Sequence, residues 1–286
     1  MKNDQVPFTK RQNMRTDTFE FFHYADTEPR TVEAHEHTFY EVFFFLSGDV
    51  EYMIEGRTYT LHPGDILLTS PRDIHQPVIG PGQTYERYLF WLRPEYLARL
   101  DALGGSSVLA CFEDAAKKGF RLIRPGAGRV TQLKKLCIQL GQTCSDTAYG
   151  YDMLSHAYLL EFLARLNMTY FEMSEETSVE VTQDRKINEV VAYINGHLQD
   201  ELTLDDLSRI CFLSKYYLSN RFKAYTGMTI YGYIMKKRLG TARQMLRQGM
   251  PVMEACTACG FGDYSNFLKA FKREFGMTPR AFRRDA

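Results

Sequence analysis

Residues 34–41 (AHEHTFYE) bring together side chains that can ligate a metal or bind a polar ligand. His35 and His37 stand one residue apart, and Glu41 follows four positions after the second histidine. On a β-strand alternate residues share a face, so we expect these three side chains to point the same way. The same face would carry Phe39, Phe43 and Phe45. Imidazoles and a carboxylate beside aromatic rings are typical of a metal site or of a small-molecule pocket.

The elements that position these residues are predicted to form a small β-barrel or sandwich followed by helices. Short runs rich in Phe, Tyr, Val and Ile alternate with turn signals between residues 18 and 92. Those signals are SGD (47–49), EGR (55–57), HPGD (62–65) and SPRD (70–73). After Pro94 the apolar spacing becomes helical, as at Leu154, Tyr158, Phe162 and Leu166. We expect this stripe to be a packing seam and, where it is exposed, a dimer contact.

Length and composition indicate a globular protein of two domains. The chain has 286 residues, of which 44% are hydrophobic, enough for packed cores in both domains. The densest apolar run, VFFFL at 42–46, is too short to cross a bilayer, and the N-terminal residues do not resemble a signal peptide. We therefore expect a cytoplasmic protein, with no membrane partner and with its six cysteines reduced.

Charge separates the two parts of the chain. From Asp184 onward there are 17 Lys and Arg against 10 Asp and Glu, a net charge of +7. The preceding residues hold the remaining 18 basic and 25 acidic side chains, a net charge of −7. A basic module joined to an acidic one indicates a unit that binds a polyanion and is attached to a domain with another task.

The basic part is predicted to be helical and to contain two helix-turn-helix units. Thr203 and Ser214 are N-cap residues for two short helices, and Gly227 ends the second. The same plan returns after a connector at about 229–247, with a turn at Gly260. In each unit a small residue, Ser208 or Cys256, stands four positions before the turn residue. A connector of this length spans about 28 Å, which would place two recognition helices in successive major grooves.

The exposed faces of the two recognition helices are the predicted nucleic-acid contacts. Their opposite faces carry Leu218 with Phe222, and Phe267 with Phe271, at core spacing. Asparagine reads adenine, lysine donates to guanine and a leucine methyl fits thymine, as at Leu268, so these faces are suited to base contacts. The predicted base-contacting residues are Tyr216, Ser219, Asn220, Lys223, Tyr264, Ser265, Asn266 and Lys269. The predicted phosphate contacts are Lys215, Arg221, Lys272, Arg273 and the tail PRAFRR.

Residues 184–286 resemble the DNA-binding domain of the AraC/XylS family of bacterial transcription regulators. The resemblance rests on LTLDDLSRICFLSKYYLSNRFKAYTGMT, on KKRLGTARQML in the connector, and on ACGFGDYSNFLKAFKREFGMTPRAFRR. It implies two helix-turn-helix units with base contacts in each. Phe212 stands where the family usually has a glycine in the turn, and a bulky residue is expected to resist positive φ there.

The first half resembles the cupin-like ligand-binding barrel of sugar-responsive AraC-type regulators. HEHTFYEVFFFLSG is similar to the first cupin motif, and PRDIH, which ends at His75, is similar to the second. Asp73 departs from that second motif, which usually has glycine there. The resemblance implies that His75 joins the other two histidines and Glu41.

Three interpretations of this set stay open. We favour contacts to a small polar effector, with apolar walls from Phe43, Phe45, Tyr52 and Trp91. A divalent metal held by His35, His37, Glu41 and His75 is the second, and internal packing of core residues is the third.

The fold class expected is α+β with two domains. An arm at 1–17 precedes a cupin-like sensing and dimerisation domain at 18–171, a linker at 172–184 and a double helix-turn-helix domain at 185–286. The predicted function is a homodimeric regulator, without catalytic residues or a required cofactor, that senses a sugar or its derivative. Its expected partners are promoter DNA, the effector and RNA polymerase. The alternative function is a metal-dependent cupin enzyme fused to a DNA-targeting module.

Overall fold

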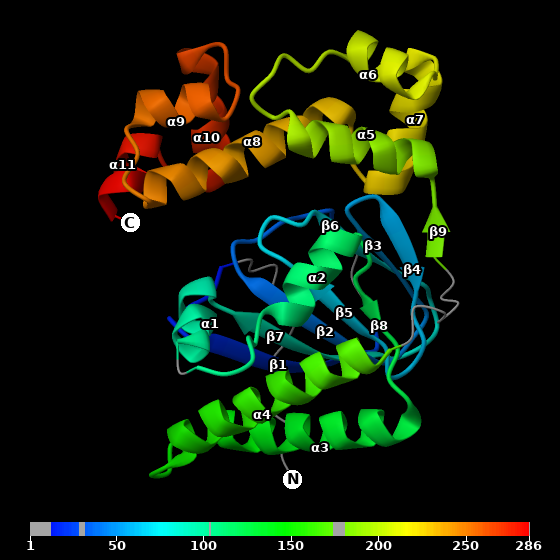
Figure 1. The fold of residues 1–286 in the computed structure, drawn as a ribbon, viewed down its shortest axis with the longest axis vertical. Helices are drawn as coiled ribbons and strands as arrows, with labels where there is room; N and C mark the ends of the chain where they lie inside the picture. The colour runs from blue at the N-terminus through cyan, green and yellow to red at the C-terminus, as the bar shows by residue number, and fades with distance from the viewer. Residues whose placement is uncertain (1–12, 29–31, 103, 174–180, 286) are drawn as a thin grey trace. The chain divides into compact units, whose positions relative to one another are not determined.

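The computed structural model describes residues 13–28, 32–102, 104–173 and 181–285 and divides the chain into two compact units (Figure 1). The first unit contains Met1–Ile54 and Thr58–Thr182, and the second contains Glu55–Arg57 and Gln183–Ala286. The first holds two β-sheets with helices, whereas the second is built of helices (Figure 1). Most of the predicted arm, residues 1–12, lies outside the described residues. None of the helices among the described residues is long and apolar enough to span a membrane.

Two β-sheets form the first unit, and the strand pairs of the larger one are antiparallel. The larger sheet has the strand order β1 (Phe19–Asp26), β7 (Tyr85–Leu92), β2 (Tyr40–Ser47), β5 (Ile66–Thr69) and β8 (Leu122–Ile123). The smaller has the order β6 (His75–Ile79), β3 (Val50–Ile54), β4 (Arg57–Thr60) and β9 (Val181–Gln183). The predicted turn signals fall between consecutive strands of this arrangement, so the barrel-like β-fold expected from the sequence is confirmed.

The apolar run in β2 is continuous because the larger sheet is buried on both faces. Phe43 and Phe45 lie in an inner core with residues of the smaller sheet such as Tyr52. Val42 and Phe44 lie in an outer core that the helices cover. Strands buried on both faces lose the usual alternation of apolar and polar residues.

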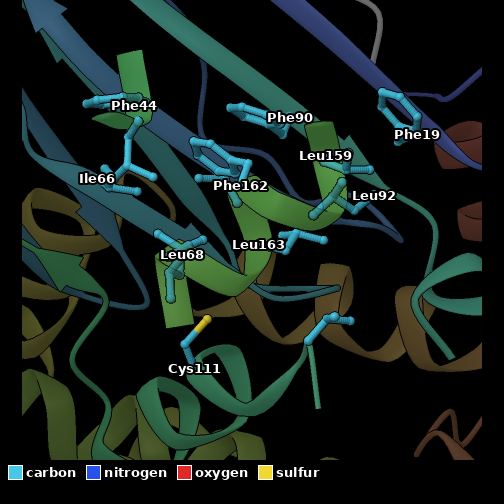
Figure 2. Close-up of a cluster of buried hydrophobic side chains, with 14 of the residues drawn as sticks. Phe19, Phe44, Ile66, Leu68, Phe90, Leu92, Cys111, Leu159, Phe162 and Leu163 are labelled. Atoms are coloured by element: carbon cyan, nitrogen blue, oxygen red, sulfur yellow. The ribbon is translucent and has the colours of Figure 1, made fainter. Parts of the chain in front are cut away.

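Helices α1 (Pro94–Asp101), α2 (Ala110–Lys118), α3 (Ala127–Cys144) and α4 (Tyr151–Glu172) contribute to this outer core. Figure 2 shows Leu159, Phe162 and Leu163 of α4 beside strand residues including Phe90. The rings of Phe90 and Phe162 stack with their centroids 4.2 Å apart. Burying a side chain of this size contributes about 1.5–3 kcal/mol, so α4 is strongly held on the sheet.

The predicted stripe on α4 is a packing seam along most of its length. Phe162 and Leu166 are fully buried, Tyr158 is partly buried, and Leu154 is 41% exposed at the N-terminal end. A second apolar row lies on the solvent side of the same helix. Its members recur every three or four positions and are exposed: Met153, Ala157, Leu160, Ala164, Met168 and Phe171.

Seven helices form the second unit. They are α5 (Arg185–Gly196), α6 (Leu204–Cys211), α7 (Lys215–Thr226), α8 (Ile230–Arg247), α9 (Val252–Ala258), α10 (Tyr264–Phe275) and α11 (Pro279–Asp285), as described from residue 183 to 285. The predicted caps Thr203 and Ser214 are present, and Asp263 caps α10 in the same way: each side chain accepts a hydrogen bond from a backbone N–H in the first turn. The all-helical prediction for this half is confirmed.

The two pairs α6–α7 and α9–α10 share one turn geometry. The backbone N–H of Leu213 donates to the carbonyl of Ser208, and that of Phe261 donates to the carbonyl of Cys256, both at 3.1 Å. Gly260 has φ +86°, and Phe212 also adopts positive φ, at +54°. The bulky residue therefore does adopt the conformation that it was expected to resist, and it bears a local strain of about 1–2 kcal/mol there.

Candidate functional site

The polar residues predicted from the sequence gather in the first unit. Atom Nε2 of His37 lies 3.7 Å from Oε2 of Glu41, and Nε2 of His75 lies 4.0 Å from Oε1 of the same carboxylate. All three side chains are buried. His35 and His75 face each other across an isolated β-bridge, with their ring centroids 4.2 Å apart. The structure thus brings the predicted set of four residues together.

The backbone that delivers these residues differs from the prediction. We expected one strand from His35 to Phe45, but β2 begins at Tyr40 and the chain bends before it. In that bend the carbonyl of His37 accepts a hydrogen bond from the backbone N–H of Arg72, which does not belong to β5 or β6. The continuous strand was therefore a wrong prediction, because His37 is held by the turn at 70–73.

The orientation of each histidine is set by a backbone carbonyl. Atom Nδ1 of His37 lies 2.9 Å from the carbonyl oxygen of Phe39, and Nδ1 of His75 lies 2.8 Å from that of Asp73. Nδ1 of His35 makes the same contact to Glu33, at 2.9 Å. A carbonyl oxygen can only accept, so Nδ1 carries the proton in all three rings. In the neutral rings Nε2 then holds a lone pair.

Asp73, the departure from the second cupin motif, supports His75. Its carboxylate accepts a hydrogen bond from the backbone N–H of Ser70 at 2.8 Å and pairs with Arg121 at 2.9 Å. These contacts fix the short turn whose carbonyl then holds the imidazole of His75. The aspartate therefore has a positioning role that glycine would not supply.

Glu41 is held by groups of the barrel interior. The indole N–H of Trp91 donates to Oε2 at 2.6 Å, and the hydroxyl of Tyr52 lies 3.5 Å from Oε1. Burial raises the pKa of Glu41 to about 7, while these two hydrogen bonds act to lower it. The carboxylate is thus fixed in place, although its charge is costly to bury.

The predicted aromatic walls are also in place. Phe43, Tyr52 and Trp91 are buried, and the rings of Phe43 and Tyr52 lie 4.8 Å apart. Trp91 packs against Phe39, with ring centroids 4.8 Å apart, in a small cluster with Met14. A polar group of four residues with apolar walls can orient a polar molecule or hold a metal ion.

One buried cation of the barrel escaped the sequence-based search. Arg87 on β7 pairs with Asp26, and its guanidinium lies over the rings of Tyr24 and Tyr85 at 4.9 and 3.9 Å. The residue stands two positions from Leu89 and four from Trp91, so it shares their face of β7. That two-residue spacing was the signal that could have identified it.

The second unit presents the predicted recognition faces. Leu218 and Phe222 of α7, and Phe267 and Phe271 of α10, are fully buried, as expected. The predicted base-contacting residues lie on the other side of the helices. Seven of them are exposed and Ser219 is partly exposed: Tyr216, Ser219, Asn220, Lys223, Tyr264, Ser265, Asn266 and Lys269. Leu268, by contrast, packs partly against the core, which limits its reach toward thymine.

Two of the predicted phosphate contacts have carboxylate partners within the second unit. Arg221 donates through Nε to Asp184 at 2.5 Å, and Lys215 pairs with Asp205. Asp184 is also the N-cap of α5, so its pairing with Arg221 connects that helix to α7. Lys272 and Arg273 lie exposed in the last turn of α10.

The cysteines take no part in either site. Cys256 and Cys259, spaced as CxxC, are buried in the core between α8, α9 and α10, so both have a packing role. Burial raises the pKa of Cys259 to about 12. All six cysteines are free thiols, as expected.

Comparison with known proteins identifies both halves. Residues 19–163 match the model of the AraC-like ligand binding domain, and residues 207–285 match that of a helix-turn-helix domain. The HTH-type transcriptional activator RhaS of Salmonella schwarzengrund (strain CVM19633) is 28% identical over 270 residues, which cover 91% of this chain and 92% of RhaS. RhaS of Salmonella arizonae gives the same identity and coverage.

Two solved structures with sequence likeness to the chain each cover about a third of it, 36% and 35%. A transcriptional regulator with an AraC-type DNA-binding domain from Chromobacterium violaceum is 30% identical over 35% of this chain and 89% of its own, with a TM-score of 0.33. The C-terminal domain of AraT from Geobacillus stearothermophilus is 26% identical over 36% and 87%, with a TM-score of 0.35. The RhaS relatives are transcriptional activators rather than enzymes, so the alternative of a metal-dependent enzyme fused to a DNA-targeting module is set aside. The chain belongs to the AraC family of transcriptional regulators, with an N-terminal ligand-binding domain and a C-terminal helix-turn-helix domain.

Proposed function

We propose that this regulator senses a sugar or a sugar derivative in its barrel and adjusts its binding to promoter DNA accordingly. The observation that carries the proposal is a buried polar cluster beside aromatic rings, on the same chain as two helix-turn-helix units. Aromatic rings pack on the apolar faces of a sugar while polar side chains bind its hydroxyls. Bound effector shifts the regulator between two states only by its difference in affinity for them.

The proposed effector contacts are the polar cluster and the walls around it. His35, His37 and His75 would bind hydroxyl groups, and Glu41 would accept from them. Phe43, Tyr52 and Trp91 would supply the apolar surface. Promoter DNA lies in the cytoplasm of a bacterium, so we place the regulator there.

The two recognition helices are proposed to enter successive major grooves. Helix α8 between them has 18 residues and therefore spans about 27 Å, close to one turn of B-DNA. Base contacts would come from Tyr216, Ser219, Asn220 and Lys223 in α7 and from Tyr264, Ser265, Asn266 and Lys269 in α10. Lys215, Arg221, Lys272 and Arg273 would bind phosphates and so supply affinity without reading sequence.

A homodimer is proposed to form through the exposed row on α4. Met153, Leu160, Met168 and Phe171 are 70%, 39%, 51% and 58% exposed, an unusual amount of apolar side chain for a solvent-facing helix. Their spacing of three or four residues fits helix-to-helix packing with a second copy. RNA polymerase is the further partner that we propose for the DNA-bound dimer, because the curated relatives are activators.

The DNA-binding role is tested with the full chain and a promoter fragment in a salt titration. We expect affinity to fall steeply between 50 and 200 mM salt, by about 10³-fold or more if six or more phosphates are contacted. Lys269→Ala should weaken specific binding by about 1–3 kcal/mol if it contacts a base. Lys135→Ala, an exposed lysine of α3, is the matched control and should bind as the wild type does. A shallow salt dependence would contradict the phosphate contacts.

The sensing role is tested by thermal shift against a panel of sugars. An effector present at a hundredfold over its Kd should stabilise the first unit by about 2.7 kcal/mol. Phe43→Ala should lose that stabilisation, because it removes the ring proposed to line the pocket. A panel that raises no melting temperature would argue against a sugar.

A further inference from the structure

We propose that His37, Glu41 and His75 together bind one divalent transition-metal ion. The proposal rests on the sensing role proposed above and deepens it: with the metal bound, effector hydroxyls would occupy its open coordination positions instead of bonding directly to His37, Glu41 and His75. Among the residues that the structure describes, this is the one group of three or more His, Cys, Asp or Glu side chains with ligand atoms this close together.

The first argument is the convergence of the ligand atoms. One atom from each residue lies within 4.8 Å of the others. Nε2 of His37 lies 3.7 Å from Oε2 of Glu41, and Nε2 of His75 lies 4.0 Å from Oε1 of the same carboxylate. Nitrogen and oxygen ligands of one metal, each about 2.0–2.2 Å from it, lie about 2.8–3.6 Å apart, from octahedral to tetrahedral angles. The same 3.7 and 4.0 Å are too long for direct hydrogen bonds between imidazole and carboxylate. A movement of each ligand atom by less than about 1 Å toward a common centre would bring the three atoms to these distances.

The second argument is the tautomer of the two histidines. Each donates its Nδ1 proton to a backbone carbonyl, Phe39 in one case and Asp73 in the other, which leaves the Nε2 lone pair on the side of Glu41. A histidine that ligates a metal through one ring nitrogen usually donates the proton of the other nitrogen to a carbonyl, a carboxylate or a water. A histidine that hydrogen-bonds a carboxylate would instead present a proton to it.

The third argument is the support behind the carboxylate. Trp91 donates to Oε2 of Glu41 at 2.6 Å, so that this oxygen is oriented before any ligand arrives. Carboxylates that ligate metals are commonly hydrogen-bonded in this way. The two backbone carbonyls and Trp91 thus already orient the three ligand residues, as a metal site requires.

The chemistry of the set selects the class of metal. Two imidazole nitrogens and one carboxylate oxygen suit Mn²⁺, Fe²⁺, Co²⁺, Ni²⁺ or Zn²⁺, whereas Mg²⁺ and Ca²⁺ prefer oxygen ligands. His35 lies beside the set, with its ring 4.2 Å from that of His75, and is the nearest candidate for a fourth ligand. Three protein ligands leave coordination positions open.

The test is a titration of the tag-free full chain with Co²⁺ after treatment with a chelator. We expect one Co²⁺ per chain by elemental analysis, visible absorption typical of nitrogen and oxygen ligands, and a raised melting temperature. His75→Gln and Glu41→Gln should each weaken Co²⁺ binding by at least about 100-fold, because each removes a ligand. His23→Gln is the matched control: it lies on β1 in the same unit and pairs with Glu86, and it should bind Co²⁺ normally.

Trp91→Phe tests the orienting contact without removing a ligand. It should retain one Co²⁺ per chain but weaken affinity by about 10- to 100-fold. The melting temperature of each metal-free variant shows whether it is folded. Loss of the Co²⁺-induced rise in a variant with an unchanged metal-free melting temperature supports the site directly.

Two results would overturn the proposal. One is the absence of stoichiometric binding and stabilisation by Co²⁺, Zn²⁺ and Mn²⁺ in the wild type. The other is Co²⁺ binding that survives both His75→Gln and Glu41→Gln. Promoter binding and the sugar panel are measured on the same preparations, so failure of the metal site is distinguished from failure of the regulatory role.

Discussion

The two helix-turn-helix units reach the same turn with different residues. In the second, Gly260 adopts φ +86° without a side chain, and an added Cβ would lie 2.1 Å from the carbonyl oxygen of Leu198. In the first, Phe212 adopts φ +54°, and its ring is 87% exposed. Glycine is thus sterically required in one unit, whereas in the other the space beyond the turn is open.

What replaces glycine in the first unit is a set of local contacts. Lys186 of α5 donates through Nζ to the carbonyl of Cys211 at 2.6 Å and lies 5.6 Å from the ring of Phe212. The hydroxyl of Ser208 donates to the carbonyl of Leu213 at 2.5 Å. In the second unit the corresponding contact, from the thiol of Cys256 to the carbonyl of Phe261, is a weaker one at 4.0 Å. The comparison shows that a turn can be set by side-chain hydrogen bonds as well as by glycine.

The largest effect is expected from Gly260→Ala. The new Cβ would overlap the backbone and hold positive φ, so the free energy of unfolding should fall by about 3 kcal/mol. Urea unfolding measures the loss, and hydrogen exchange should locate it in α9 and α10. Phe212→Ala, which places the same residue type at the corresponding turn, should change stability far less. Equal losses in the two variants would refute the asymmetry.

A smaller loss is expected from Ser208→Ala. Removing the hydroxyl leaves the carbonyl of Leu213 without this donor, at a cost of about 1 kcal/mol in urea unfolding. Cys256→Ser is the matched change in the second unit and should be nearly neutral, because its hydroxyl gains the carbonyl of Phe261 as an acceptor. If Cys256→Ser cost as much as Ser208→Ala, the hydrogen bond would not be what sets the first turn.

The smallest effect, and one of opposite sign, is expected from Phe212→Gly. Relief of the strained φ gains about 1–2 kcal/mol, which the greater entropy of glycine in the unfolded chain reduces by about 0.5–1 kcal/mol. The unfolding free energy should therefore rise by about 0.5 kcal/mol. A clear decrease in the same urea measurement would show that the contact with Lys186 outweighs the strain.

Much of the second unit follows from local sequence signals. Caps such as Thr203 and Asp263, the glycines at helix ends and the spacing of Phe267 and Phe271 each act within one or two turns of a helix. Two helices of this unit, α5 and α11, were not predicted individually. Both begin with recognisable signals, the N-cap Asp184 and Pro279 at the first helical position.

Less of the first unit is predictable, because its site depends on contacts between distant residues. Alternation along a strand predicted that His37 and Glu41 share a face. The bend before Tyr40, however, contains a hydrogen bond from the backbone N–H of Arg72 to the carbonyl of His37, and Arg72 is more than thirty residues away in the sequence. The pairing of His35 with His75 and the support of Asp73 by Arg121 are equally non-local. The short strand β8 and helix α2 were missed for the same reason, since tertiary packing outweighs their weak local patterns.

The contact between Trp91 and Glu41 has a practical consequence. The chain contains one tryptophan, and its indole is bonded to the carboxylate at the centre of the candidate site. Tryptophan fluorescence of the 286-residue chain is therefore an optical signal from this site alone, requiring neither a label nor a substitution. Quenching or a spectral shift on addition of an effector or a metal would report occupancy in real time, even while the regulator is bound to DNA.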